Sequence, residues 1–209
     1  PAILFDLDGT LTDSGEGIIN CVLPALAHYG ITPANRESLR YFVGPPLRDS
    51  FLKAGVPAKK VEEAIAIYRS RYVPIGMFEN HPYDGIRDLL AELKSRGHQL
   101  YVATSKPENM ANAILDKFEL SQHFDLICGA TMDDTRDSKD KVIAYLLQQI
   151  GHQAAVMVGD TSYDVIGAAA HKIPTVGVSW GYGTVEDLSK AGAIAIVNSP
   201  AELLAALAE

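Results

Sequence analysis

Two carboxylates stand close together near the start of the chain, directly after an apolar run. Asp6 and Asp8 follow residues 3–5 (Ile-Leu-Phe), and Gly9 comes next. If the apolar run is a β-strand, its side chains alternate with a period of two, so both carboxylates project to the same side. Neighbouring carboxylates repel one another unless a cation or a shared proton compensates. With Gly9 permitting a sharp turn, the pattern predicts a metal-assisted site in which one carboxylate is the nucleophile.

Further polar groups follow later apolar runs of the chain: Thr104 with Ser105, then Lys139, then Asp160 with Asp164. Taken singly, each has an ordinary explanation, because hydroxyls cap helices, lysines are solvated, and aspartates favour the first turn of a helix. Taken together, a nucleophilic carboxylate, a hydroxyl, a cation and a further carboxylate are the groups that phosphoryl transfer needs. We therefore expect these residues to form one phosphoryl-transfer site.

The chain beyond residue 82 alternates between helical and strand patterns, which predicts the elements that position these groups. Helices are expected at 84–96, from 107 to 115, 138–150 and 163–170; strands are expected at 100–103, 124–130, 154–158 and 175–178; and a strand–helix pair is expected at 193–208. Near-continuous apolar strands between helices are typical of a parallel sheet covered on both faces. Ligands bind outside the carboxyl ends of such strands, where the polar groups lie.

Residues 14–81 interrupt this alternation, because their apolar positions have helical spacing and no convincing strand. Asp13 and Glu16 resemble a capping box, which would start the first helix of this segment. The pattern predicts an α/β fold with a Rossmann-like, doubly wound parallel sheet. Residues 1–13 and 82–209 would form this catalytic core, and residues 14–81 a small helical cap domain inserted after the first strand, hinged near 12–14 and 80–82.

Four segments resemble the motifs of the haloacid dehalogenase superfamily of phosphatases, which use an aspartate as nucleophile. They are residues 5–11 (FDLDGTL), 103–106 (ATSK), 138–143 (SKDKVI) and 158–164 (VGDTSYD). The phosphoglycolate phosphatase-like branch, with its helical cap after the first motif, is the most similar branch; residues 44–47 (GPPL) and 177–183 (GVSWGYG) carry that weaker resemblance. The resemblance implies a hydrolase that acts on phosphoric monoesters.

The same resemblance implies a role for each residue of the reaction. Asp6 would attack phosphorus and become an aspartyl phosphate, and Asp8 would act as general acid and then as general base. Thr104 would donate its hydroxyl to the phosphate, aided by backbone N–H groups near Ser105. Lys139 would neutralise the nucleophile and the phosphoryl oxygens as charge shifts during the reaction.

A magnesium site is implied in the same way. Mg²⁺ would bind the Asp6 carboxylate, the Asp8 backbone carbonyl and Asp160, with waters and a phosphate oxygen completing an octahedron. Asp164 would complete the acidic set by orienting a metal-bound water or Lys139. We therefore take these four aspartates together as the candidate metal site.

Two basic residues leave alternatives open. Lys141 lies two residues from Lys139, and on a helix the two side chains would face about 200° apart, so only one can enter the site; the motif favours Lys139. Arg48, in the cap, is a candidate contact for an anionic substrate such as a phosphorylated carboxylate, and the alternative is a solvated surface arginine. A helical cap over the cleft restricts access, which favours a small phosphorylated metabolite over a phosphoprotein as substrate.

The leading hypothesis is a Mg²⁺-dependent phosphatase of a small metabolite, with 2-phosphoglycolate as a candidate substrate. A 5′-nucleotidase or a broad-specificity phosphatase on the same scaffold is the alternative, because fold and motifs do not fix the substrate. A remote alternative from another class is a phospho-receiver signalling module, which also surrounds an aspartate with acidic residues, a hydroxyl and a lysine. Receivers are shorter and carry no helical insertion after the first strand.

Composition limits the other partners. The net charge of −8 argues against nucleic-acid binding through a general basic surface. No apolar run approaches the ~20 residues that span a bilayer, and the start of the chain does not read as a signal peptide, so no membrane partner is expected. Cys21 and Cys128 lie among apolar neighbours and are expected to be reduced core thiols, which is typical of a cytoplasmic protein. We expect a monomer or a homodimer.

Charge is distributed unevenly between the two parts of the chain. Residues 14–81 contain 8 Lys and Arg against 6 Asp and Glu, whereas the remainder contains 10 against 20. One interpretation is an acidic core that binds a cation beneath a slightly basic cover that meets an anion. The alternative is ordinary variation of surface charge, since charge counts inform association and not fold.

Overall fold

A six-stranded parallel sheet forms the centre of the computed structural model, which describes residues 1–208. Its strands lie in the order β5-β4-β1-β6-β7-β8. Their bounds are Ala2–Phe5 for β1, Gln99–Pro107 for β4, Leu126–Ala130 for β5, Ala155–Gly159 for β6, Thr175–Val178 for β7 and Ala195–Val197 for β8. The chain begins in the middle of the sheet and winds outward in both directions, so the predicted doubly wound α/β fold is confirmed.

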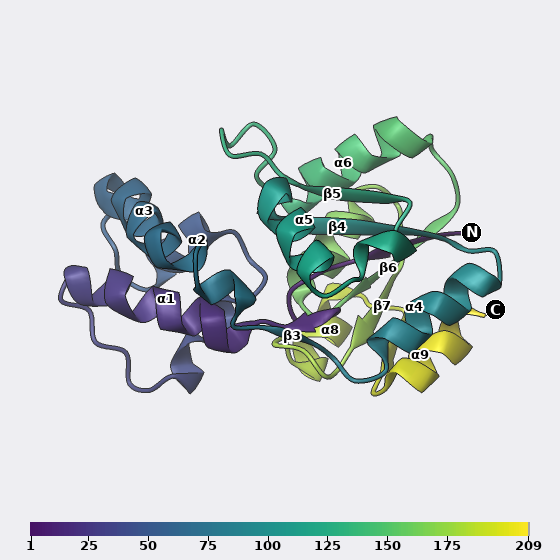
Figure 1. Cartoon of the computed structure of the whole chain (residues 1–209), viewed down its shortest axis with the longest axis horizontal. Helices are drawn as coiled ribbons and strands as arrows, with labels where there is room; N and C mark the ends of the chain where they lie inside the picture. Colours follow the sequence, from purple (N-terminus) through teal and green to yellow (C-terminus); the bar gives the residue numbers. More distant parts are fainter. Residues whose placement is uncertain (209) are drawn as a thin grey trace.

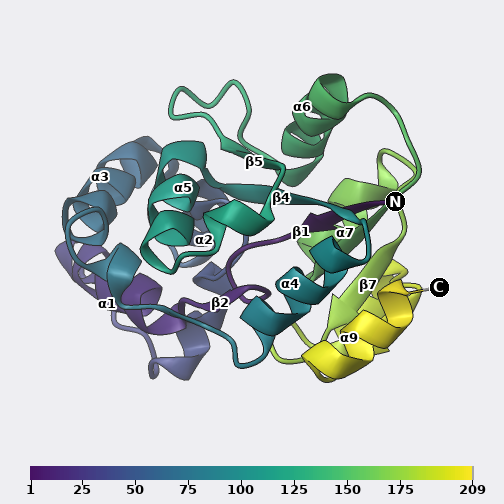
Figure 2. The same ribbon diagram turned by 45° about the vertical axis from the view of Figure 1, so that its right-hand side comes forward.

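Helices cover both faces of this sheet, as Figures 1 and 2 show. One face carries α4 (Ile86–Ser95), α5 (Glu108–Lys117) and α9 (Pro200–Leu207), and the other carries α6 (Lys139–Ile150) and α7 (Ser162–Ala169); α8 (Val185–Ala191) packs beside α7 and β8. Strand β1 shows why: Ile3 and Phe5 belong to the core on the first face, while Ala2 and Leu4 belong to the core on the second. A strand with both faces buried must be apolar throughout.

Residues between β2 (Thr12–Asp13) and β3 (His81–Pro82) form a separate group of helices, which we call the helical insertion. It contains α1 (Gly15–His28), α2 (Leu47–Lys53) and α3 (Val61–Tyr72), with the short 3-10 helices Glu37–Phe42, Ala58–Lys60 and Gly76–Phe78; a further one, Ser121–His123, lies outside it. Strands β2 and β3 pair antiparallel, so the chain enters and leaves the insertion at neighbouring points. Figure 1 shows the insertion beside the sheet, beyond β3.

A row of buried aromatic rings fills the interior of the insertion. The rings of Phe42 and Phe51 meet edge to face at 5.1 Å, and Tyr68 stacks on Tyr72 at 5.1 Å. Phe51 also meets Tyr68 edge to face, which makes the row continuous. Aromatic pairs of this kind add stabilisation beyond the apolar area that they bury. The row ends at Tyr72, whose hydroxyl points out of the insertion and contacts Lys106 of β4.

The predicted capping box at the start of α1 is wrong. Ser14 is the N-cap residue of this helix, and its own side chain forms no capping hydrogen bond. Tyr182 takes over the function, because its hydroxyl accepts a hydrogen bond from the Gly15 backbone N–H at 3.1 Å and donates one to the Asp13 carboxylate. A group distant in the sequence therefore satisfies the first free N–H of the helix.

Two other expectations can be compared with the described residues. Within residues 1–208, no helix is long and apolar enough to cross a membrane. Cys21 and Cys128 are both buried and free, in agreement with the prediction of reduced core thiols.

The closest backbone approach in the insertion gives a first prediction. Gly17 of α1 faces the Gly76 carbonyl oxygen, and an added Cβ would lie 1.9 Å from that oxygen. Gly17→Ala must push α1 from the segment that follows α3, so we expect a loss of about 1–3 kcal/mol in the free energy of unfolding, measured by urea denaturation. Ala27→Ser, at an exposed position of the same helix, should change it by less than about 0.5 kcal/mol. Equal effects of the two substitutions would contradict this packing.

Candidate active site

The first acidic pair lies at the carboxyl edge of the sheet, where β1 ends. Asp6 follows the strand directly, and its backbone N–H still donates to the Val158 carbonyl at 2.9 Å, so the sheet fixes its position. The chain then turns at Gly9, which has a φ of +84°. A Cβ at Gly9 would lie 2.1 Å from an Asp160 carboxylate oxygen, so a side chain is excluded there. The turn thus brings the ends of β1 and β6 into contact.

Lys139 joins two of the acidic residues. Its Nζ donates to Asp6 Oδ1 at 2.7 Å and to the Ala103 carbonyl at 2.8 Å, and it forms an ion pair with Asp164 Oδ1 at 2.9 Å. Its side chain is buried at the start of α6. Burial opposes its charge, but the carboxylates of Asp164 and Asp6 outweigh burial and raise the pKa of Lys139 above its ordinary value.

Lys141 lies outside this cluster. Its side chain is exposed and pairs with Asp137 at 3.0 Å. Of the two lysines between which the sequence left a choice, the structure therefore brings Lys139 to the acidic residues. The two side chains diverge because two residues along a helix point in nearly opposite directions.

Three buried carboxylates lie together at this ammonium group, which pairs directly with two of them, Asp6 and Asp164. Oxygen atoms of Asp6, Asp160 and Asp164 all lie within 4.8 Å of one another. Burial, together with the Asp164 charge, raises the pKa of Asp6 to about 7, and burial together with the Asp6 charge raises the pKa of Asp160 well above its usual range. The cluster therefore has more negative charge than Lys139 neutralises. A divalent cation bound by carboxylate oxygens would supply the missing charge, so the residues fit the predicted Mg²⁺ site.

The two later aspartates are held by different partners. Asp164 accepts the backbone N–H groups of Asp160 and Thr161 on Oδ2, at 3.0 and 3.1 Å, and its Oδ1 forms an ion pair with Lys139. Asp160 accepts the Tyr182 backbone N–H at 2.9 Å and the Thr10 hydroxyl at 3.3 Å. Asp164 therefore closes the first turn of α7 and orients Lys139 at the same time. This is one of the two roles that the sequence left open for it.

Asp8 lies in a different environment from Asp6. Its Oδ2 is 3.2 Å from Lys106 Nζ, while its Oδ1 is buried without a hydrogen-bond partner in residues 1–208. The Lys106 ammonium also contacts the Tyr72 hydroxyl and lies 4.5 Å from the centre of the Tyr72 ring. Lys106 therefore connects the candidate general acid to the helical insertion. Sequence reasoning assigned Lys106 no role, although its place after Thr104 at the same strand end was a usable signal.

Thr104 and Ser105 follow the buried part of β4, as predicted, but their hydroxyls have different partners. Thr104 is buried, and its Oγ1 accepts the Lys106 backbone N–H at 3.1 Å. The Ser105 hydroxyl donates to the Gly44 carbonyl of the insertion at 2.6 Å. Thr104 thus lies within the site, whereas the side chain of Ser105 connects the sheet to the insertion.

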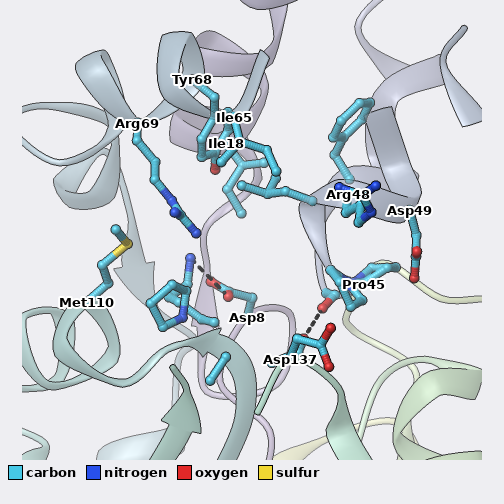
Figure 3. A pocket seen from close by; sticks show the side chains of 18 of the residues that line it. Asp8, Ile18, Pro45, Arg48, Asp49, Ile65, Tyr68, Arg69, Met110 and Asp137 are labelled. Atoms are coloured by element: carbon cyan, nitrogen blue, oxygen red, sulfur yellow. Dashed lines mark hydrogen bonds and ion pairs between the residues drawn. The ribbon is translucent and has the colours of Figure 1, made fainter. Parts of the chain in front are cut away.

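A cavity of about 180 Å³ lies between the insertion and this edge of the sheet. Figure 3 shows Asp8 at its floor, Tyr68 and Arg69 of α3 above it, and Arg48 of α2 at one side. The Arg48 side chain is largely exposed and pairs with Glu62 at 2.8 Å. Arg48 therefore borders the cavity, and its predicted contact with substrate stays a prediction.

Comparisons with known proteins agree with this geometry. A family model for haloacid dehalogenase-like hydrolases matches residues 3–178. The chain is 43% identical over 199 residues to the tyrosine-protein kinase PtkA of Mycobacterium tuberculosis, covering 94% of this chain and 68% of that protein. It is 42% identical over 191 residues to a 5′-nucleotidase of Pseudomonas aeruginosa, covering 90% of this chain and 86% of that protein.

Among solved structures, the fold is similar to that of a predicted phosphatase from Clostridium acetobutylicum. The TM-score is 0.96 at 43% sequence identity, and the match covers 99% of this chain and 97% of that one. The family match includes all the strand-end residues described above. The protein therefore belongs to the haloacid dehalogenase-like hydrolase family, as its motifs predicted, and is a hydrolase of the phosphatase type.

Proposed function

We propose that this protein is a Mg²⁺-dependent phosphatase that hydrolyses a small phosphorylated metabolite through an aspartyl phosphate on Asp6. The observation that carries the proposal is the buried Asp6–Lys139–Asp164 ion-pair network behind Asp8, which lines the cavity between the sheet and the insertion. A nucleophilic carboxylate, a fixed cation and a second carboxylate near the leaving group are the groups that stepwise phosphoryl transfer requires.

In the first step, an Asp6 oxygen forms a bond to phosphorus while the ester P–O bond breaks. Asp8 gives its proton to the departing oxygen. Its buried Oδ1, which has no hydrogen-bond partner among residues 1–208, is the oxygen available to carry that proton. Lys139 holds Asp6 in place and offsets the charge that develops on the phosphoryl oxygens. Thr104, buried and hydrogen-bonded to the Lys106 backbone N–H, would donate its hydroxyl to the phosphate.

In the second step, Asp8 accepts a proton from a water molecule, which attacks phosphorus and releases the Asp6 carboxylate and inorganic phosphate. Dividing the reaction into two transfers lowers each barrier. The general acid–base work of Asp8 is typically worth about 10²–10⁴-fold in rate. The helical insertion limits the entry of water, which strengthens the electrostatic interactions inside the site.

The magnesium ion would be held by Asp6, Asp160 and the Asp8 backbone carbonyl. When bound, it would neutralise the excess carboxylate charge and the phosphoryl oxygens. Asp164 supports the site from outside, because its oxygens are engaged with Lys139 and with backbone N–H groups. The high pKa of Asp6 and Asp160 supports this assignment, since carboxylates that resist ionisation in isolation gain most from a cation.

The size of the cavity supports a small substrate. About 180 Å³ accommodates a short leaving group, and residues of the insertion line one side of the cavity. The first candidate substrate is a phosphorylated short hydroxy acid such as 2-phosphoglycolate. The second candidate substrate is a nucleoside monophosphate, favoured by the Tyr68 ring on the cavity wall and by the 5′-nucleotidase relative.

The direct experiment is a screen of the purified protein with Mg²⁺ against phosphorylated metabolites, with kcat/KM as the ranking quantity. We expect small monoesters to be hydrolysed and phosphoproteins to be poor substrates. Release of phosphate from no small monoester would contradict the proposed function.

Asp6→Asn should abolish turnover, because an amide is no nucleophile and binds a cation weakly. We expect kcat to fall at least about 10⁴-fold, measured with the best substrate of the screen. Asp88→Asn, an exposed aspartate of α4, is the matched control and should keep wild-type activity. Retained phosphatase activity in the Asp6 variant would refute the nucleophile.

Asp8→Asn should slow both steps and leave some enzyme phosphorylated, because the second step then lacks its base. We expect kcat to fall by about 10²–10⁴-fold. Intact-protein mass spectrometry after rapid quenching should detect one added phosphoryl group. If no covalent species forms under any quench, the stepwise route loses its support.

The acidic cluster predicts how stability depends on pH when the protein is free of metal. The pKa of Asp6 is raised from 3.8 to about 7, so the folded state favours the protonated form. Its contribution to stability is complete below pH 3.8 and is lost as the pH rises through about 7. In EDTA, the urea midpoint should therefore fall over this range more steeply for the wild type than for Asp6→Asn.

Added Mg²⁺ should raise the wild-type urea midpoint, with the larger effect at the upper end of that pH range, because it binds only the folded site. Calorimetry should detect Mg²⁺ binding to the wild type and to Asp88→Asn, and much weaker binding to Asp160→Asn. A midpoint that Mg²⁺ leaves unchanged at every pH would contradict the metal site.

A further inference from the structure

Three cationic side chains border the cavity: Arg48, Arg69 and Lys106. Arg48 pairs with Glu62 at 2.8 Å, and Lys106 pairs with Asp8 at 3.2 Å. Across the part of the chain that the structure describes, no carboxylate lies within ion-pair distance of Arg69, and its Nε is buried without a hydrogen-bond partner. Arg69 is therefore the cavity cation whose charge the protein itself leaves uncompensated.

An arginine in this position has a physical cost. The side chain as a whole is half-buried, and its buried Nε is an N–H donor that needs an acceptor. A buried donor without an acceptor costs free energy, and more so when it is charged. The apolar side chains of Ile18, Ile65 and Met110 also border the cavity and lower the local polarity. The same surroundings would strengthen the attraction of Arg69 for an anion.

The direction of Arg69 indicates where that anion would lie. In Figure 3, Arg69 extends from α3 toward Asp8, whereas Asp49 and Asp137 border the other side of the cavity. Asp137 is already paired with Lys141. Asp8 marks the position of the leaving oxygen in the proposed reaction. An anion on Arg69 would therefore belong to the leaving group of the substrate.

We propose that Arg69 binds a carboxylate on the leaving group and so selects phosphate esters of short hydroxy acids. This inference rests on the proposed function and deepens it, because it assigns the side chain that distinguishes this substrate class from other phosphate esters. A planar carboxylate matches the fork of N–H donors on a guanidinium, and the small cavity leaves room for a short chain between the two anions. Arg69 is thus a specificity residue that the sequence did not single out.

Binding of phosphonates tests this without requiring turnover. In 2-carboxyethylphosphonate a methylene group replaces the ester oxygen of 2-phosphoglycolate, so the compound cannot be hydrolysed, and propylphosphonate has a methyl group in place of its carboxylate. Isothermal titration calorimetry in Mg²⁺ would measure the Kd of both compounds. We expect the wild type to prefer the carboxylate at least about tenfold, as for a charge-assisted hydrogen-bond pair.

Three variants locate the preference. Arg69→Met should reduce the preference for the carboxylate compound to less than about twofold while leaving the Kd of propylphosphonate unchanged. Arg69→Lys should retain part of the preference, since an ammonium is a weaker match for a carboxylate. Arg48→Met should keep the full preference. A wild type without preference, an equal loss of affinity for both compounds in Arg69→Met, or a preference that disappears only in Arg48→Met would each overturn the proposal.

The proposed function is tested separately with p-nitrophenyl phosphate, which carries no carboxylate. A protein that hydrolyses it but shows no Arg69-dependent preference would be a phosphatase of another substrate class, and the inference would be wrong. A protein that shows the preference but releases phosphate from neither this ester nor 2-phosphoglycolate would refute the reaction while leaving the recognition by Arg69 in place.

Discussion

The arrangement of the strand ends in this structure depends on three buried carboxylates that lie together beside a single lysine. Lys139 pairs with two carboxylates and donates to the Ala103 carbonyl, and each of these contacts is 2.9 Å or shorter. It still leaves Asp6 and Asp160 difficult to ionise. Such a cluster is costly in a fold unless a cation and a reacting anion use it. The sheet supplies the rigidity for this arrangement, because every member of the cluster lies at a strand end or in the first turn of a helix.

The helical insertion is connected to the reacting groups through the end of one strand. Ser105 donates to the Gly44 carbonyl, and Lys106 contacts both Asp8 and Tyr72. At a second place, Arg40 of the insertion donates to the Gly181 carbonyl at 3.3 Å. These contacts fix the position of the side chains that would recognise the leaving group relative to the side chains that would act on phosphorus. Closure of the cavity and alignment of Asp8 depend on the same residues, which suits an enzyme whose chemistry must exclude water.

Much of the fold and of the acidic cluster could be predicted from the sequence, because apolar runs, helical spacing and strand-end carboxylates are local patterns. Strand 175–178 was placed correctly to the residue, and Asp6 and Asp160 do meet. The two-residue strands β2 and β3 and the short helix α8 were not predicted, because strands paired across a long insertion and a helix of seven residues leave little local signal. The prediction of a capping box at the start of α1 was wrong because the hydroxyl of Tyr182, which is distant in the sequence, accepts the Gly15 N–H. The position of Lys106 was a usable signal, but its contact with Asp8 is a tertiary property, as are the cavity that Arg69 borders and its lack of an ion-pair partner within residues 1–208.

The central claim is that Asp6 itself takes the phosphoryl group, with a divalent cation beside it. A crystal structure of the protein with Mg²⁺ and beryllium trifluoride, which mimics a phosphoryl group on a carboxylate, tests this most directly. The account predicts beryllium bonded to an Asp6 oxygen, its fluorines near Lys139 and Thr104, and Mg²⁺ between Asp6 and Asp160. Beryllium trifluoride bound to another residue, or Mg²⁺ found away from the acidic cluster, would contradict it.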